Sequence, residues 1–172
     1  MNTNIILIGM AGCGKSTLGV LLAKALGYEF IDTDLIIQKN EHRLLQDILN
    51  TDGLEYFRRA EELALLSVCT ERAVIATGGS AVYCTDGMMH LKRHGICVWL
   101  KLPFDEILRR IKNIATRGIA IAPGKTLEDV YNEREPLYKH YADITIDCQG
   151  DIEHNVAAVL EGIESSSECG NH

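Results

Sequence analysis

Residues 4–26 read NIILIGMAGCGKSTLGVLLAKAL, and this stretch decides the fold. The apolar run at 4–8, rich in β-branched residues, predicts a buried parallel strand. From residue 15 to residue 26, apolar residues recur at helical spacing, and Gly27 follows where glycine commonly ends a helix. The sequence therefore predicts a strand, a glycine-rich turn and a helix in direct succession.

The turn, residues 9–16, fits the phosphate-loop pattern G-x-x-x-x-G-K-[ST]. Between a strand and a helix, such a turn gathers backbone N–H groups and the positive end of the helix dipole around one anion. Lys15 is expected to reach the β- and γ-phosphates of a nucleotide, and the Ser16 hydroxyl to bind Mg²⁺. A plain glycine-rich turn is the alternative, but the flanking elements favour a phosphate site. We predict that ATP binds to Gly12, Cys13, Gly14, Lys15, Ser16 and Thr17.

The chain has 172 residues, of which 47% are hydrophobic and 24% charged, as expected for a single globular domain. We expect this domain to span residues 1–164, and the polar residues 165–172 to form a disordered tail. No apolar run approaches the ~20 residues that a membrane span needs, and residues 1–10 lack an export signal. The sequence therefore predicts a cytoplasmic protein without a membrane partner.

The formal net charge is −7 at pH 7. Nucleic-acid recognition needs a basic surface, so this charge argues against a nucleic-acid partner. It allows a small anionic substrate, because a few arginines can create a positive potential inside a cleft.

Six cysteines are present, and none forms a C-x-x-C pair. This spacing favours reduced core thiols over a disulfide framework or a metal site. Cys13 lies inside the phosphate loop, so exposure and oxidation are the alternative for this thiol. His90 and His94 stand four residues apart without a third ligand, which favours a solvated helix face over a metal site.

Strand-like runs alternate with amphipathic helical patterns along the chain. The strands are expected at residues 4–8, 29–32, 73–77, 96–100 and 143–147. The helical patterns cover residues 15–26, 34–39, 44–50, 53–71, 86–93, 103–114, 126–140 and 151–163. Such alternation predicts an α/β fold in which helices cover both faces of a parallel sheet. The segment 116–125 lacks clear periodicity and is a lid candidate.

Two aspartates, Asp32 and Asp34, follow the second predicted strand. In extended backbone their carboxylates would point the same way, at the carboxyl end of the sheet, where parallel sheets bind ligands. One could hold Mg²⁺ through water while the other accepts a proton from a substrate hydroxyl. A helix N-cap is the alternative for either residue, although the nearby phosphate loop favours the functional role.

Arginines and paired glycines give weaker signals. Arg58 fits a fork aimed at a substrate carboxylate, but taken alone surface ion pairs with Glu61 and Glu62 are favoured. Gly78 and Gly79 fit either a close approach of backbone to a ligand or a simple turn. Roles toward nucleotide or substrate, or plain solvent exposure, are open for Arg109, Arg110, Arg117 and Arg134.

Taken together, the motifs resemble those of the shikimate kinases, small phosphate-loop enzymes related to nucleoside monophosphate kinases. The resemblance covers about residues 4–147 and rests on a joint pattern. The pattern consists of the loop at 9–16, Asp32-Thr33-Asp34, Thr51-Asp52-Gly53, Phe57-Arg58-Arg59 with Glu61, Gly78-Gly79, Arg110, Arg117, and Arg134 with Pro136-Leu137-Tyr138 and Ala142-Asp143.

The resemblance implies a three-layer α/β/α fold with a five-stranded parallel sheet of order 2-3-1-4-5. It also implies a substrate-binding segment near residues 33–61 and a lid near residues 112–124. The implied activity is ATP-dependent phosphorylation of the 3-hydroxyl of shikimate, with Mg²⁺ as cofactor, in aromatic amino acid biosynthesis. A monomer is the implied default state.

Residue roles follow from the same resemblance. Ser16 and Asp32 serve the metal, and Arg110 lies against the adenine. The implied catalytic residues are Lys15, Asp34 and Arg117, of which Asp34 orients and deprotonates the hydroxyl and Arg117 also binds ATP. The implied substrate-binding residues are Asp34, Arg58, Gly78, Gly79 and Arg134.

The chain departs from the family pattern at two positions. Ser80 stands where the family has a third glycine, and adds a side chain near the substrate. Gly118 follows Arg117 where the family has proline, so the lid arginine should be less pre-organised. These departures keep open a kinase for another small hydroxylated acid. A nucleotide-binding module without transfer is the other alternative, and the predicted hydroxy-acid clamp argues against it.

Overall fold

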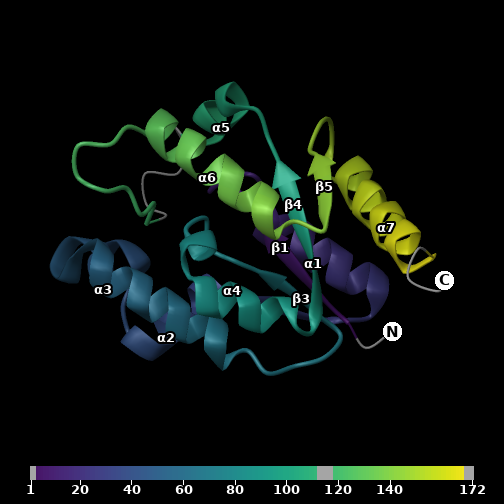
Figure 1. Cartoon of the computed structure of the whole chain (residues 1–172), viewed down its shortest axis with the longest axis horizontal. Helices are drawn as coiled ribbons and strands as arrows, with labels where there is room; N and C mark the ends of the chain where they lie inside the picture. Colours follow the sequence, from purple (N-terminus) through teal and green to yellow (C-terminus); the bar gives the residue numbers. More distant parts are fainter. Residues whose placement is uncertain (1–2, 112–117, 169–172) are drawn as a thin grey trace.

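A parallel sheet of five strands runs through the residues that the computed structural model describes, 3–111 and 118–168 (Figure 1). The strands are β1 (Asn4–Ile8), β2 (Glu29–Asp32), β3 (Ala73–Ala76), β4 (Gly95–Lys101) and β5 (Ile144–Asp147). Their order is β2-β3-β1-β4-β5, and all neighbours are parallel. The sheet predicted from the sequence and the order implied by the resemblance are confirmed.

Helices flank this sheet on both faces, as predicted. Within the described ranges they are α1 (Lys15–Leu26), α2 (Thr33–Glu41), α3 (Leu45–Ser67), α4 (Thr85–Lys92), α5 (Phe104–Ile111), α6 (Leu127–Tyr141) and α7 (Ile152–Glu168), with the short 3-10 helix η1 (Ala81–Tyr83). In Figure 1, α6 lies in front of the sheet and packs on β4, while α1 lies behind it and contacts α7.

Local sequence signals fix where the helices nearest the loops begin and end. Gly14 precedes α1 with a φ of 96°, and Gly27 ends α1 with a φ of 65°, both in the left-handed region that glycine tolerates. Asp32 caps α2 by accepting a hydrogen bond from the backbone N–H of Asp34. Thr126 and Asp129 form a reciprocal capping box at the start of α6.

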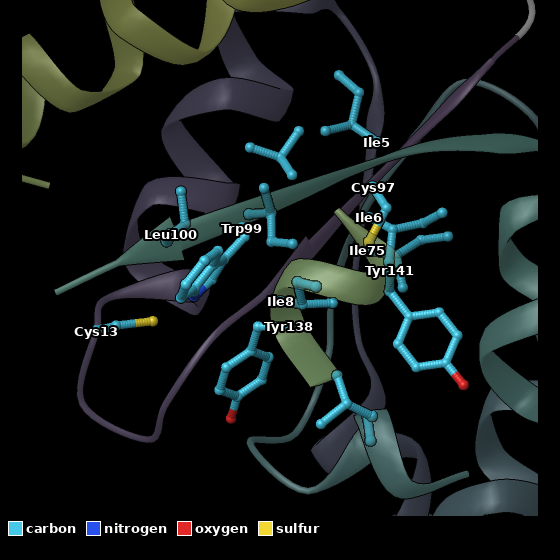
Figure 2. Packing of buried hydrophobic residues seen from close by; sticks show 14 of the residues in the cluster. Ile5, Ile6, Ile8, Cys13, Ile75, Cys97, Trp99, Leu100, Tyr138 and Tyr141 are labelled. Atoms are coloured by element: carbon cyan, nitrogen blue, oxygen red, sulfur yellow. The ribbon is translucent and has the colours of Figure 1, made fainter. Parts of the chain in front are cut away.

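The main core covers both faces of the sheet, and β1, β4 and α6 form part of it. All five residues of β1 are buried, as expected for a central parallel strand. Ile8 is in register with Trp99 of β4, and the Trp99 ring stacks on Tyr138 of α6 with 5.9 Å between centroids. Figure 2 shows these three side chains together, with Cys13 of the phosphate loop beside them. This packing holds α6 against the strands that precede the loops.

A second, smaller hydrophobic cluster lies outside the main core. It joins α2, α3 and the loop before α6, and consists of the buried residues Ile37, Leu45, Ile48, Phe57, Ala64 and Ala120. The segment predicted to bind substrate, residues 33–61, is therefore packed largely on itself and on Ala120.

Several predicted boundaries differ from the structure. The patterns at 44–50 and 53–71 form one helix, α3, kinked at Gly53 (φ 80°) and ending at Ser67. Because α3 ends there, Cys69 is exposed and the prediction that it is a core thiol is wrong. The helix α7 continues to Glu168, into the segment expected to be a disordered tail. Residues 112–114 of the predicted helix 103–114, and residues 169–172, lie outside the described residues.

Four of the cysteines are buried free thiols, as predicted: Cys13, Cys84, Cys97 and Cys148. Burial raises the pKa of the Cys84, Cys97 and Cys148 thiols to about 12, so they stay protonated at neutral pH. The exposure considered for Cys13 is not observed. Across the described ranges, no helix has the length and apolar character to cross a membrane.

Candidate active site

The phosphate loop has the backbone that its glycines predict. Gly9, Gly12 and Gly14 have φ values of 146°, 81° and 96°. A Cβ at Gly9 would lie 2.7 Å from the carbonyl oxygen of Leu100, so glycine is required where the loop leaves β1. The loop ends at the start of α1, which gives it the anion-binding geometry of a helix N-terminus.

Lys15 is turned back over this loop. Its side chain is buried, and Nζ donates hydrogen bonds to the carbonyl oxygens of Gly9 (2.7 Å) and Met10 (2.9 Å). Nζ also lies 3.6 Å from the Cys13 sulfur. These hydrogen bonds hold the ammonium of Lys15 over the turn, where it can contact phosphate oxygens.

The two residues expected to serve a metal are in direct contact. The Ser16 hydroxyl donates a 2.7 Å hydrogen bond to Oδ2 of Asp32. The other oxygen of Asp32, Oδ1, accepts the hydrogen bond that caps α2. Hydroxyl and carboxylate oxygens are the hard donors that Mg²⁺ prefers, and Mg²⁺ in nucleotide sites needs few protein ligands. The donor set therefore fits Mg²⁺ between the phosphate loop and β2.

A cavity of about 350 Å³ opens beside the loop, at the carboxyl ends of β1, β2 and β3. Its lining includes most of the predicted ATP-binding residues, both aspartates, Glu61 and three of the predicted substrate-binding residues. These are Gly12, Gly14, Lys15, Ser16, Thr17, Asp32, Asp34, Glu61, Gly78, Gly79 and Arg134. Phosphate-binding and hydroxy-acid-binding candidates thus border one cavity.

Asp34 lies in this cavity for a different reason than the one predicted. It is in the first turn of α2, not in extended backbone, so the expected strand-like alternation with Asp32 is wrong. The start of the helix instead carries both side chains to the cavity wall. Gly78 leaves room for it, because a Cβ there would lie 3.0 Å from Asp34 Oδ1 and 2.4 Å from Glu61 Oε1, and these carboxylates would have to shift.

Glu61 is a buried carboxyl in the cavity wall. It is fully buried, and the Ser80 hydroxyl donates a 2.5 Å hydrogen bond to its Oε2. Its Oε1 is buried without a hydrogen-bond partner. Burial raises the pKa of Glu61 to about 7, and the negative charge of Asp34 adds to the rise, while the Ser80 hydrogen bond and Arg134 oppose it. The Ser80 side chain, expected from the sequence to lie near the substrate, therefore contacts Glu61.

Arg134 is a second cationic group in the cavity wall, besides Lys15. Its side chain is only 2% exposed, and its Nη2 donates a 2.7 Å hydrogen bond to the carbonyl oxygen of Ala120. Its Nε is buried without a hydrogen-bond partner. A Cβ at Gly79 would lie 3.1 Å from Arg134 Nη1, so this glycine allows the guanidinium to approach the backbone.

Arg58 reaches the same region through Tyr83. Its guanidinium carbon lies 4.5 Å from the centre of the Tyr83 ring, and that of Arg134 lies 5.5 Å from the same ring. Arg58 forms no ion pair with Glu61 or Glu62, so the surface ion pairs that its spacing favoured are not present among the described residues. Arg58 does not itself border the cavity.

The nucleotide side of the loop is covered by α5. Nη1 of Arg110 lies 3.5 Å from the carbonyl oxygen of Gly12. Nε of Arg110 donates a hydrogen bond to Oε1 of Glu106. Hydrogen bonds from Arg109 and Arg110 lower the pKa of Glu106 to about 2. Arg110 is therefore held over the phosphate loop, whereas Arg109 is exposed and only pairs with Glu106.

The loop before α6 meets the cavity from the other side. Gly118, Ile119 and Ala120 border it, and Gly118 has a φ of 48°. A Cβ at Gly118 would lie 2.6 Å from the Cβ of Leu45, at the start of α3. Arg117, expected to act on the phosphoryl group, lies outside the described residues, as do all the residues of the lid segment 112–124 that precede Gly118.

Three contributors were not singled out from the sequence. Gln38 borders the cavity, and its Oε1 accepts from the backbone N–H of Leu45. Tyr138 donates a 2.6 Å hydrogen bond to the carbonyl oxygen of Gly79. Tyr83 lies in η1, a single turn that is too short to show a periodic sequence pattern.

The predicted histidine pair gives no sign of a metal site. A ring nitrogen of His90 bonds the carbonyl oxygen of Val68, and the described residues hold no cluster of three metal-ligating side chains.

Comparison with known proteins gives one consistent family. The family model described as shikimate kinase matches residues 11–164. The chain is 36% identical to shikimate kinase 2 of Dickeya chrysanthemi, over 86% of this chain and 88% of that protein. It is 35% identical to the shikimate kinase of Synechococcus elongatus, over 94% and 87% of the two chains. A shikimate kinase from Acinetobacter baumannii, solved in complex with shikimate, superposes with a TM-score of 0.86 at 32% identity, over 95% of this chain and 94% of that one. The chain therefore belongs to the shikimate kinase family.

Proposed function

We infer that the chain transfers the γ-phosphoryl group of ATP to the 3-hydroxyl of shikimate, a step of aromatic amino acid biosynthesis. One observation carries this inference: the phosphate loop, Asp34 and Arg134 border a single cavity. Donor and acceptor can therefore lie next to one another, and this positioning is a main requirement of phosphoryl transfer.

The phosphate end of the cavity binds the donor. The backbone N–H groups of Gly12–Thr17 and the ammonium of Lys15 would hold the β- and γ-phosphates of ATP. Ser16 and Asp32, already 2.7 Å apart, would hold Mg²⁺. When bound, Mg²⁺ would neutralise charge on the phosphate oxygens. Arg110, over the loop, would lie against the adenine.

The opposite end binds the acceptor. Asp34 would accept the proton of the 3-hydroxyl and orient its oxygen toward the γ-phosphate. The carboxylate of shikimate would bind Arg134 and Arg58, whose buried Nε atoms both lack a hydrogen-bond partner. Gly78 and Gly79 would let the sugar-like ring approach the backbone.

The loop from Gly118 onward would complete the site. The contact of Arg134 with the Ala120 carbonyl already holds this loop against the cavity. A lid over residues 112–124 would exclude water that could otherwise hydrolyse ATP, and Arg117 would stabilise charge on the transferring phosphoryl group.

The chain is proposed to act as a cytoplasmic monomer formed by one domain over residues 1–164. Its net charge of −7 argues against a nucleic-acid partner. Light scattering on the purified chain tests the monomer directly, and a dimer mass at micromolar concentration would contradict it.

The test is ADP release coupled to a spectrophotometric readout, with ATP, Mg²⁺ and one acceptor at a time. Shikimate should support release, whereas quinate, gluconate and no acceptor should support little. Release with gluconate or quinate but not shikimate would instead favour a kinase for another hydroxy acid. Nucleotide binding without release for any acceptor would favour a binding module.

A further inference from the structure

We propose that Tyr83 is a positioning residue that holds Arg58 and Arg134 together as one carboxylate-binding pair. The inference rests on the proposed function, since it describes how that site binds the carboxylate of its substrate. It starts from one geometric fact: both guanidinium carbons lie over the same ring, 4.5 Å and 5.5 Å from its centre. The negatively charged face of an aromatic ring attracts each cation at such distances.

The two arginines come from different elements, so a third residue is needed to fix the position of one guanidinium relative to the other. Arg58 lies on α3 and Arg134 on α6. Neither forms an ion pair within 4.0 Å with a carboxylate of the described residues, and the Nε of each is buried without a hydrogen-bond partner. The two like charges repel one another, and the nearby carboxyl groups of Glu61 and Glu133 act on them only at longer range than an ion pair. The Tyr83 ring supplies attraction to both without neutralising either, so both stay available for an anion.

The ring itself is anchored at its far end. Tyr83 Oη donates a 2.6 Å hydrogen bond to Oε1 of Glu133, the neighbour of Arg134 on α6. Lys125, which precedes α6, donates to the other oxygen of Glu133. The ring is therefore fixed to α6 through its hydroxyl and to α3 through Arg58. Loss of the ring should loosen Arg58 relative to Arg134, while the phosphate loop stays intact.

The test compares Tyr83→Leu and Tyr83→Phe with the wild type in the coupled assay. Tyr83→Leu should raise KM for shikimate about tenfold, with KM for ATP changed less than about twofold. Tyr83→Phe keeps the ring but loses the hydroxyl that anchors it to Glu133, so its KM for shikimate should lie between those of wild type and Tyr83→Leu. Tyr56→Leu is the matched control: Tyr56 also has an arginine, Arg43, over its ring and an anchoring carboxylate, Glu41, but does not border the cavity.

The preference for the acid over its methyl ester distinguishes carboxylate binding from a purely structural role, because a general structural defect would lower activity with both substrates alike. Wild type and Tyr56→Leu should strongly prefer shikimate over its methyl ester in kcat/KM, and Tyr83→Leu should lose most of that preference. Should Tyr83→Leu fail to fold, fluorinated phenylalanines at position 83 replace it. Each added fluorine weakens the ring face at nearly constant shape, so KM for shikimate should rise stepwise.

The outcomes separate the two inferences. An active wild type, with acid-to-ester preference unchanged in Tyr83→Leu or across the fluorinated series, would overturn the role of Tyr83 alone. A wild type that releases no ADP with shikimate would overturn the proposed function, and the role of Tyr83 with it.

Discussion

Asp32 caps a helix and contacts the phosphate loop with the same side chain, so the cap and the proposed metal role, which the sequence presented as alternatives, are compatible. One oxygen caps α2 and the other accepts the Ser16 hydroxyl. A carboxylate has enough lone pairs for a cap and a second partner, so a capping position next to a phosphate loop does not exclude metal binding. The cap also fixes the carboxylate in place, which suits a ligand that must meet Mg²⁺ without rearrangement.

Asp34→Asn should abolish transfer while leaving nucleotide binding in place. The amide is nearly isosteric but cannot accept the hydroxyl proton, so kcat should fall by about 100-fold or more. Calorimetric titration with an ATP analogue and Mg²⁺ should give an affinity close to that of wild type. A kcat close to that of wild type would contradict the role of Asp34 as the base.

Glu61 should make the stability of the chain depend on pH. Its pKa is about 7 in the folded chain, against 4.5 for an ordinary glutamate, so the folded state holds its proton more tightly than the unfolded state does. The stabilising effect is complete below about pH 4.5 and is lost as pH rises toward 7. Urea unfolding should therefore show wild type losing about 3 kcal/mol relative to Glu61→Gln between pH 4.5 and 7, and nothing further above pH 7.

Ser80→Ala provides the control for that measurement. The Ser80 hydroxyl lowers the pKa of Glu61, so its removal should move the upper end of the transition to higher pH. A free-energy difference between wild type and Glu61→Gln that does not vary with pH would contradict the assignment.

At the scale of elements, the loop before α6 explains why glycine stands at 118. With a φ of 48°, this position cannot be proline, whose ring fixes φ near −65°. Its contact with Leu45 leaves no room for a Cβ. The structure thus shows a glycine required by the docking of the loop on α3. The expectation that Gly118 leaves Arg117 less pre-organised concerns a residue outside those described, and stays a prediction.

Gly118→Ala should impair catalysis through that contact. The added methyl group meets Leu45 and should displace the loop from the cavity, lowering kcat/KM for shikimate about tenfold or more. Gly124→Ala is the matched control, because Gly124 also has a positive φ (82°) in the same loop, but a Cβ added there would meet nothing within 4 Å. It should cost about 1 kcal/mol of stability and leave kcat/KM near wild type. Equal kinetic losses in both variants would show that backbone strain, not the Leu45 contact, matters.

Elements with strong periodicity were predictable, and irregular ones were not. The apolar β-branched runs placed all five strands within a residue or two. The end of α3 at Ser67 and the position of Cys69 were missed, because helical periodicity alone does not mark where packing stops. Tyr83 was missed since η1 is one turn long, and its partners, Arg58 and Glu133, are far away in the sequence.

For the whole molecule, the strand order is what creates the site. Placing β1 between β3 and β4 brings the phosphate loop beside the loops after β2 and β3. Alternating strands and helices predict a parallel sheet but leave its order open, and here only the family resemblance supplied it. The closeness of Asp34, Glu61 and Arg134 therefore could not follow from spacing.

The rise in Tm caused by each ligand should report separately on the acceptor end and the phosphate end of the cavity. Saturating shikimate should raise the Tm of wild type by about 5 °C or more, since a ligand that binds only the folded state stabilises it. Arg134→Met, similar in length but uncharged, should lose this rise and keep the rise caused by ATP with Mg²⁺. Loss of both rises would indicate that Arg134 supports the whole cavity rather than the acid.

The most direct test of the account is to identify the product formed from ATP, Mg²⁺ and shikimate. The central claim is that one cavity aligns the 3-hydroxyl of shikimate with the γ-phosphate. Phosphorus–proton correlation NMR should therefore show shikimate phosphorylated at the 3-position, with one ADP formed per product molecule. ADP formed without phosphorylated shikimate, or a phosphate on a different hydroxyl, would contradict that claim.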